Sequence, residues 1–300
     1  GGPADVERAR ALFDKACKGG NAGACTSEGL LYADADAPGH DLNKARVLFT
    51  SGCMGGYPTG CMVGAMMADA GDGGPVDRVL SRKLYQAGCD RNFAEACHNL
   101  AGMLAGCSGG PCEVLKARVA YRKGCEGKFL PACGKLGDMH RKGLGGPKNG
   151  KAALKLHTVA CDEGLLDSCV GKAEILWAGE AGPRDVEAAM TTYEMTCAME
   201  HAMSCHILGQ HRFAAAKTAE QRQEGLAAFA AGCGFRGQGS CLRLMMIHLH
   251  GQGGMIADVS EAQLWFARAM LVTIGLFDEH PEMQQLTSPG DGPIPEQRPD

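Results

Sequence analysis

The cysteines of this 300-residue chain constrain its fold more than any other feature, because fourteen of the sixteen recur on a strict period of 36 residues. They form seven pairs, each with seven residues between its two cysteines. A fixed period of about 20 to 50 residues indicates a repeat protein, in which each unit contacts mainly its neighbours. The spacing therefore predicts a chain that grows lengthwise, and it overrides the two thick-cored domains that this length would otherwise suggest.

Other positions follow the same period and predict the secondary structure. Four residues before each first cysteine stands an aromatic side chain or a histidine, and eight residues before it stands a small residue. Residues four apart share one face of an α-helix, so one helix ends at each first cysteine. The ring positions are Phe13, Phe49, Tyr85, Tyr121, His157, Tyr193 and Phe229, with Trp265 one period later.

The segments between these helices complete the unit. Turn residues such as MGGYPTG separate the two cysteines, and a second helix begins near the second cysteine, as in residues 97–106. Glycine-rich loops such as residues 71–77 return the chain to the next unit, where Asp41, Asp77 and Asp185 stand at helix N-caps. The predicted fold is all-α, a right-handed solenoid of αα-hairpins, with seven repeats over residues 1–256. In the sixth unit the glycine-rich loop is replaced by residues 214–225.

The C-terminal part departs from the repeat. Residues 257–280 keep the first-helix pattern around Trp265, but Ala269 and Phe277 replace the two cysteines, which predicts a capping helix. Residues 281–300 are rich in Pro and Gly, and we expect an acidic, disordered tail there.

The paired cysteines, the small and aromatic anchors and the Gly-x-Gly loops together resemble a known family. They are similar to Sel-like repeats, a tetratricopeptide-related family of αα-hairpins, and to its cysteine-rich secreted bacterial branch, the Helicobacter cysteine-rich proteins. The resemblance covers about residues 5–275. It implies a scaffold that binds other proteins, and the cysteine-rich branch also brings a link to penicillin binding and β-lactam hydrolysis.

Disulfides are the predicted role of the cysteines. Two antiparallel helices joined by a tight turn bring facing Cα atoms within the roughly 4.4–6.8 Å that a disulfide needs. Zinc is the alternative, but neighbouring pairs lie one repeat apart, roughly 20 Å along the stack, too far to share an ion. The predicted bonds are Cys17–Cys25, Cys53–Cys61, Cys89–Cys97, Cys125–Cys133, Cys161–Cys169, Cys197–Cys205 and Cys233–Cys241.

Two further cysteines, Cys107 and Cys112, stand outside the period in the loop GCSGGPC. We predict that they bridge to each other, with an accessible redox pair as the alternative. So many disulfides do not persist in a reducing cytosol, which predicts an extracytoplasmic location: periplasmic, cell-surface or secreted. The chain has no signal peptide and opens with Gly1-Gly2-Pro3, as a mature or trimmed chain would, so export is inferred from the cysteines alone.

Composition and motifs narrow the function further. The apolar runs are too short for a transmembrane segment, and a net charge of −4 argues against a nucleic-acid partner. The chain lacks the serine β-lactamase, zinc-protease, α/β-hydrolase, P-loop and dinucleotide-binding motifs. We therefore expect a binding module rather than an enzyme, with no cofactor and no metal. A penicillin-binding or β-lactam-hydrolysing protein stays open by family analogy, and the His and Met residues around His201 keep a haem- or copper-binding protein open.

The partner is expected to be a protein or peptide, peptidoglycan-related and envelope proteins included. The family resemblance implies that the second helix of each unit lines the concave face. Equivalent positions on this helix carry different residues in different repeats, as a recognition surface would. Around the only two large aromatic residues in these slots we predict a groove formed by Arg141, Glu174, Trp177, His206, Gln210 and Phe213. Packing of Trp177 and Phe213 between repeats is the alternative.

Overall fold

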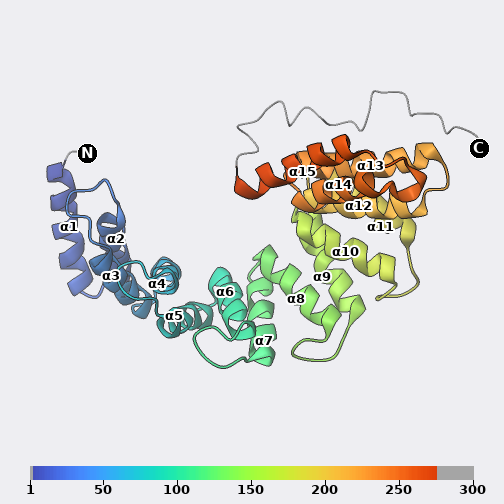
Figure 1. Cartoon of the computed structure of the whole chain (residues 1–300). Helices are drawn as coiled ribbons and strands as arrows, with labels where there is room; N and C mark the ends of the chain where they lie inside the picture. Colours follow the sequence, from blue (N-terminus) through green and yellow to red (C-terminus); the bar gives the residue numbers. More distant parts are fainter. Residues whose placement is uncertain (1–2, 276–300) are drawn as a thin grey trace, which may run out of the picture. The chain divides into compact units, whose positions relative to one another are not determined.

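The computed structural model of the chain describes residues 3–275 and is all-α over them: within that range it contains fifteen α-helices, one short 3₁₀ helix and no strand (Figure 1). This confirms the predicted fold class. The helices are α1 (Pro3–Lys18), α2 (Ala22–Ala33), α3 (Leu42–Met54), α4 (Pro58–Ala70), α5 (Arg78–Asp90), α6 (Ala94–Ala105), α7 (Val114–Glu126), α8 (Leu130–Lys142), α9 (Gly150–Asp162), α10 (Leu166–Ala178), α11 (Val186–Ala198), α12 (Ala202–Ala215), α13 (Ala219–Gly234), α14 (Gln238–His250), η1 (Gln252–Gly254) and α15 (Val259–Ile274).

The chain divides into two compact units at residues 165 and 166. Unit 1 contains α1 to α9 and unit 2 contains α10 to α15, and within each unit every α-helix packs against the next one in the chain. We call the helix that ends at a first cysteine an A helix and the helix that carries the second cysteine a B helix. The odd-numbered helices are A helices and the even-numbered ones are B helices.

Side-chain caps fix where the A helices begin. Asp41, Asp77 and Asp185 accept hydrogen bonds from the backbone three residues further on, as predicted. In the sixth repeat, where the glycine-rich loop is missing, Thr218 forms a capping box with Gln221 at the start of α13. B helices begin about three residues earlier than predicted, because Pro58 and its equivalents already belong to the first turn.

Some rings of the A helices pack against a glycine of the preceding B helix. Phe49 is fully buried, and a Cβ added to Gly29 on α2 would lie 3.2 Å from its ring. Phe229 meets Gly209 on α12 in the same way, at 2.8 Å. At these positions the absence of a side chain on the B helix lets the ring approach the backbone, so the A helix packs closely on the preceding repeat.

The disulfides close the hairpins as predicted. Seven bonds join Cα atoms 4.2 to 4.8 Å apart, and they include Cys107–Cys112 outside the period. Cys161 and Cys169 are disulfide-bonded as well, and no cysteine is free. Most periodic pairs lie in the hydrophobic core, whereas Cys107 and Cys112 are exposed. Within each compact unit, the periodic bonds thus fix the turns between an A helix and its B helix.

A series of arginines, also on the 36-residue period, fixes the loops of unit 1. Each stands seven residues before a first cysteine and donates to the carbonyl oxygen of a loop proline 28 or 29 residues later. Arg46 Nη1, for example, lies 2.9 Å from the Pro75 oxygen, and the arginine is 8% exposed. The donors are Arg10, Arg46, Arg82 and Arg118, and the acceptors are Pro38, Pro75, Pro111 and Pro147.

Replacing Arg46 by Leu is expected to free the 71–77 loop, because the Pro75 carbonyl then loses a charge-assisted bond. This position of the repeat accepts an apolar residue, since Leu154 and Leu226 occupy it in later repeats. We expect a loss of about 1–3 kcal/mol in unfolding free energy and faster amide exchange at Asp77. Lys83→Leu, at an exposed position of α5, is the control. Unchanged exchange in the loop would show that the arginine does not hold it.

The C-terminal helix α15 keeps the A-helix pattern, with Trp265 1% exposed and Ala269 buried at the cysteine position. The predicted end of the capping segment, including Phe277, and the predicted tail at 281–300 lie outside the described residues.

Candidate binding surface

The candidate surface lies on the B helices, where equivalent positions carry different side chains from one repeat to the next. In unit 1, the side chains of α4, α5 and α6 surround a hollow of about 280 Å³. It is lined by Asp69, Tyr85, His98, Asn99, Gly102 and Met103. Asp69, His98 and Gly102 occupy variable slots, whereas Tyr85 is one of the periodic rings.

Two rings give the hollow its walls. Tyr85 is 7% exposed, and burial raises the pKa of its hydroxyl, so the group stays protonated and can donate a hydrogen bond. His98 packs edge-on against Tyr121 and Phe129, with ring centroids 5.4 and 5.1 Å away. Burial, helped by the charge of Lys135, lowers the pKa of His98, which favours the neutral imidazole.

Polar groups at the rim give the hollow hydrogen-bonding capacity. Asn99 sits half-buried on α6, and Asp69 places a carboxylate at the end of α4. Arg78 lies 3.4 Å from that carboxylate, but both side chains are more than half exposed, so the ion pair is weak and a ligand can displace it. Gly102 leaves the floor open. The arrangement suits one polar or cationic side chain of an extended segment.

In unit 2, Trp177 forms a second feature of the B helices. Its ring packs on the core cluster around Tyr193 and Leu208 and stacks on His211, with ring centroids 3.7 Å apart. The Arg184 guanidinium lies 5.5 Å from the Trp177 ring centre, and Arg184 Nε donates to the Trp177 carbonyl oxygen at 2.7 Å. Trp177 is half-buried, so it both packs between repeats and keeps part of the ring accessible.

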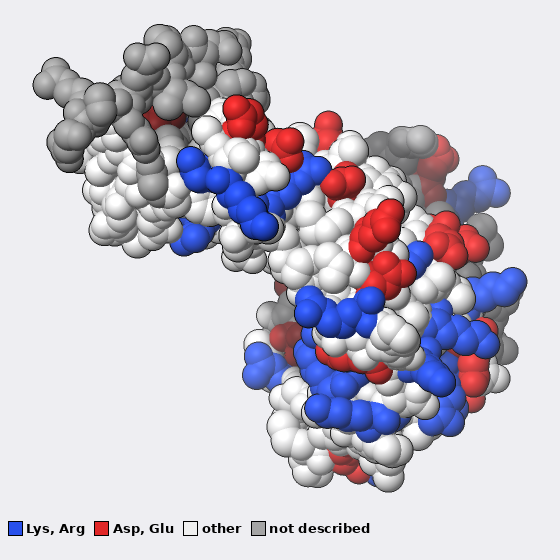
Figure 2. Space-filling model, turned by 90° about the vertical axis from the view of Figure 1, so that its right-hand side faces the viewer, with Lys and Arg blue, Asp and Glu red and all other residues white. Residues whose placement is uncertain are grey.

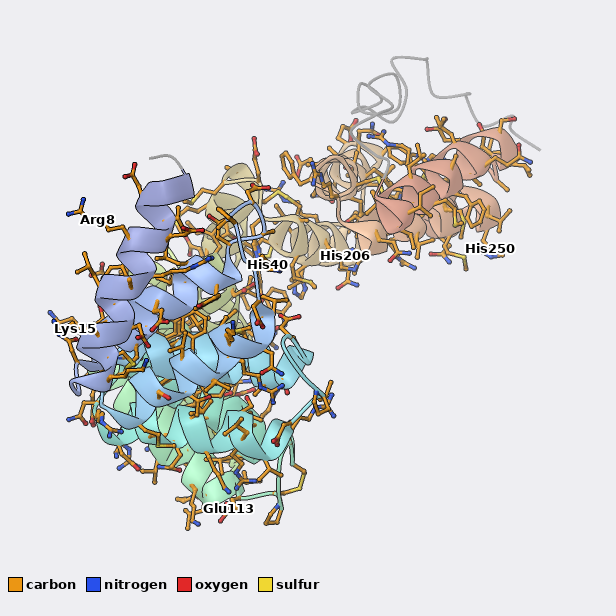
Figure 3. All side chains as sticks on the ribbon, turned by 90° about the vertical axis from the view of Figure 1, so that its left-hand side faces the viewer. Arg8, Lys15, His40, Glu113, His206 and His250 are labelled. Carbon is orange, nitrogen blue, oxygen red and sulfur yellow. A yellow bond between two sulfur atoms is a disulfide. The ribbon has the colours of Figure 1, made fainter. Side chains whose placement is uncertain are left out.

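His206 and Gln210 lie together on α12, one turn apart. Gln210 Nε2 is 2.9 Å from His206 Nε2, and the other ring nitrogen of His206 is 3.2 Å from Ser240 Oγ. Burial lowers the pKa of His206, with Arg243 acting in the same direction. Figure 3 labels His206 together with His250 at the end of α14, both on the same edge of unit 2.

The remaining predicted residues have different surroundings. Phe213 belongs to the cluster around Phe229 and Trp265 rather than to that of Trp177. An added Cβ on Gly253 would lie 2.7 Å from the Phe213 ring, so this partly buried ring makes packing contacts of the kind that the sequence offered as the alternative. Arg141, on α8 of unit 1, and Glu174, on α10 of unit 2, are both half-buried and partnered.

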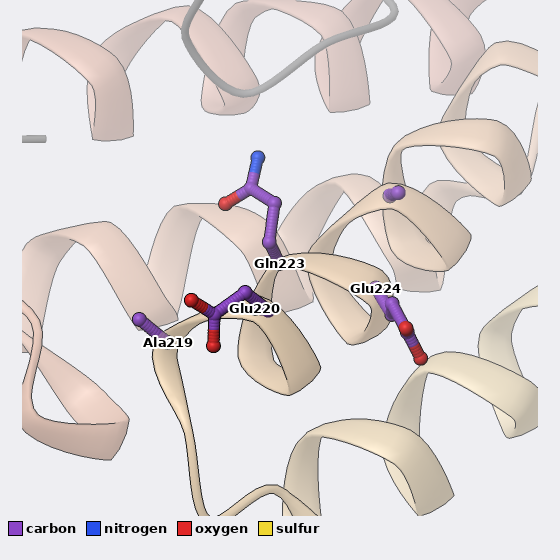
Figure 4. A pocket seen from close by; sticks show the side chains of 5 residues that line it. Ala219, Glu220, Gln223 and Glu224 are labelled. Atoms are coloured by element: carbon purple, nitrogen blue, oxygen red, sulfur yellow. The ribbon is translucent and has the colours of Figure 1, made fainter. Parts of the chain in front are cut away.

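A larger hollow, of about 430 Å³, lies on the first turns of α13 (Figure 4). Its described lining comes from one face of that helix: Ala219, Glu220, Gln223, Glu224 and Ala227. A single helix face does not provide the converging groups of a binding site.

Sequence reasoning missed several of these residues. Asp69, His98 and Gly102 belong to the slots that vary between units, but the groove was placed in later units because of Trp177 and Phe213. Asn99 carried no signal of its own. His211, Arg184 and the arginine series became apparent only from their contacts.

Over residues 3–275, no group of three or more His, Cys, Asp or Glu side chains is placed to hold a metal ion. None of the helices in that range combines the length and the apolar character that crossing a bilayer requires.

Fold and surface together define the chain as a disulfide-closed αα-repeat protein. The model of the Sel1 repeat family matches residues 1–21, 61–93, 130–165 and 237–269. The predicted resemblance to Sel-like repeats is therefore confirmed. A search of curated protein sequences finds no significant match.

Solved structures show the same fold. A Sel1 repeat protein from Oxalobacter formigenes superposes with a TM-score of 0.73 at 19% identity, over 95% of this chain and 82% of the other. The protective antigen c5321 of uropathogenic Escherichia coli, which displays an SLR fold, gives a TM-score of 0.68 at 17% identity. That match covers 90% of this chain, which spans only 59% of the antigen.

Proposed function

We propose that this protein is an exported scaffold that binds an extended protein or peptide segment along its B helices. The hollow between α4, α5 and α6 is the observation that carries the proposal, because it joins a buried hydroxyl, an amide and a carboxylate around an open floor. The Sel1 repeats support it, since repeats of this class provide long surfaces for partners.

The location follows from the sulfur chemistry. With all sixteen cysteines oxidised, the protein needs an oxidising, extracytoplasmic environment. We propose export to the periplasm, the cell surface or the medium on this basis.

Two kinds of contact would hold the partner. In unit 1, the Asp69 carboxylate and the Asn99 amide would receive a Lys, Arg or amide side chain, with Tyr85 behind them. In unit 2, the Trp177 and His211 rings would offer apolar contacts, and the pair His206 and Gln210 would offer polar ones. The large half-exposed ring and the adjacent Arg184 have the composition of a binding hot spot.

Peptides selected from a display library on the oxidised protein provide the test. A selected peptide is expected to bind Asn99→Ala about 5- to 100-fold more weakly, because its polar group loses a buried hydrogen-bond partner. Trp177→Ala is expected to weaken a peptide that reaches unit 2. Titration calorimetry measures both, with circular dichroism confirming the helix content of each variant.

Gln86→Ala is the matched control, since Gln86 is exposed on the A helix α5 next to the hollow. The proposal fails if Asn99→Ala and Trp177→Ala both bind every selected peptide as the wild type does, or if Gln86→Ala weakens binding equally.

A further inference from the structure

The charges of this chain are unevenly distributed. Residues 114–155 contain eleven Lys or Arg and two Asp or Glu, a net of +9, whereas the whole chain has a net charge of −4. The rest of the chain is therefore strongly acidic, with a net of −13. Lys and Arg side chains gather in the lower part of Figure 2, at the height at which Figure 1 draws α7, α8 and α9.

Most of these cations are free of acidic partners. Lys116 pairs with Glu113, Arg118 is buried against the 143–149 loop, and Arg141 is partnered. The other eight are exposed, and none forms an ion pair with any described residue. They are Arg122, Lys123, Lys128, Lys135, Lys142, Lys148, Lys151 and Lys155. Repulsion between unpaired like charges lowers the stability of the folded state, so their presence on one segment suggests a function.

Exposed positions on three successive A helices carry part of this charge. We call it the basic A face: Lys83 on α5, Arg122 and Lys123 on α7, and Lys151 and Lys155 on α9. Along α9, Lys151 and Lys155 stand four residues apart and therefore share one helix face.

Aliphatic side chains are interleaved with the cations of the basic A face. Val79 and Lys83 follow one another on α5, Leu115 and Val119 precede Arg122 on α7, and Val159 follows Lys155 on α9, each at helical spacing. The exposed fractions are 53% for Val79, 68% for Leu115, 43% for Val119 and 49% for Val159. Exposure of these aliphatic side chains to water contributes no stabilising free energy, whereas burying them against another apolar surface would.

We propose that the basic A face binds the surface of a membrane containing anionic phospholipids. Lysines attract the negative headgroups, and the aliphatic side chains between them reach the boundary of the acyl chains. This surface is separate from the B helices, so it leaves the peptide-binding surface free.

The side chains favour a membrane over other polyanions. Seven of the eight exposed, unpaired cations are lysines, point charges that suit a diffuse layer of headgroups, whereas arginine favours paired recognition of single phosphates. A nucleic-acid backbone would leave Leu115 and Val119 without apolar contacts. An acidic peptide would satisfy the lysines, and the experiment below separates that case.

Co-sedimentation with lipid vesicles tests the proposal. The oxidised protein is expected to bind vesicles of phosphatidylcholine with 30% phosphatidylglycerol and not vesicles of phosphatidylcholine alone, and added salt is expected to weaken binding. Lys123→Gln combined with Lys155→Gln is expected to lower the partition coefficient about 25-fold, roughly fivefold for each charge removed. Leu115→Ser is expected to weaken the binding that remains at high salt.

Lys15→Gln combined with Lys217→Gln is the control, since it removes the same charge at exposed lysines elsewhere. Equal effects of the two double variants, or equal binding to both kinds of vesicle, would overturn the proposal. So would binding to a poly-glutamate peptide without binding to the anionic vesicles, which would assign the face to an acidic peptide. Peptide binding at the B helices is measured separately and is expected to be the same in both double variants.

Discussion

Full reduction of the disulfides is expected to unfold the protein. Each periodic bond closes a loop of about nine residues, which stabilises the folded state by about 2–3 kcal/mol in the loop-entropy relation. Taken over the periodic pairs, this approaches 20 kcal/mol as an upper bound and exceeds the roughly 5–15 kcal/mol by which a domain is usually stable. Far-UV circular dichroism with a phosphine reductant measures the loss, and alkylation with mass spectrometry counts the thiols. A native helix signal from a chain with sixteen alkylated thiols would contradict the expectation.

One periodic bond and the loop bond can be compared within unit 1. Replacing Cys89 and Cys97 by Ala is expected to cost about 3–5 kcal/mol, because the bond is lost and two buried sulfur atoms leave space behind. Replacing Cys107 and Cys112 is expected to cost about 2 kcal/mol, since both are exposed. Urea unfolding followed by circular dichroism gives the unfolding free energy of each variant. A larger loss on removing Cys107–Cys112 would show that the periodic bonds are not the main stabilising disulfides.

Most of the fold could be predicted because its determinants are local and repeated. The cysteine spacing fixes the hairpin, and the ring at Phe49 and its equivalents fixes which side of the A helix is buried. The arginine series was overlooked although it has the same period. A charged residue such as Arg46 is normally exposed, and only the carbonyl of Pro75 in the folded loop explains its burial.

The binding surface was harder to predict, because a hollow depends on missing side chains as much as on the side chains that line it. Gly102 gives no signal of its own, yet it lines the hollow together with Asn99. The aromatic signal at Phe213 pointed to a ring that is used for packing. A total net charge of −4 likewise conceals the +9 of residues 114–155, since opposite charges elsewhere in the chain cancel it.

The contact between rings and glycines leads to the second large expected effect. Phe49→Ala is expected to destabilise unit 1 by about 3–5 kcal/mol, because the ring is fully buried between α2 and α4 and their backbones cannot move together to fill the space. Gly29 and Gly64 face the residue from the two sides, with added Cβ atoms 3.2 Å from its ring and 3.3 Å from its Cβ.

Val47→Ala on the same helix is the control, since Val47 is 59% exposed and its removal leaves no cavity. Circular dichroism in urea must follow both variants, because Trp177 and Trp265 lie in unit 2 and their fluorescence does not report on unit 1. Phe49→Leu is expected to fall between the two, since it keeps part of the buried volume. If Phe49→Ala unfolds at the same urea concentration as Val47→Ala, the ring does not hold neighbouring repeats together, and the disulfides alone would have to account for the stability of the stack.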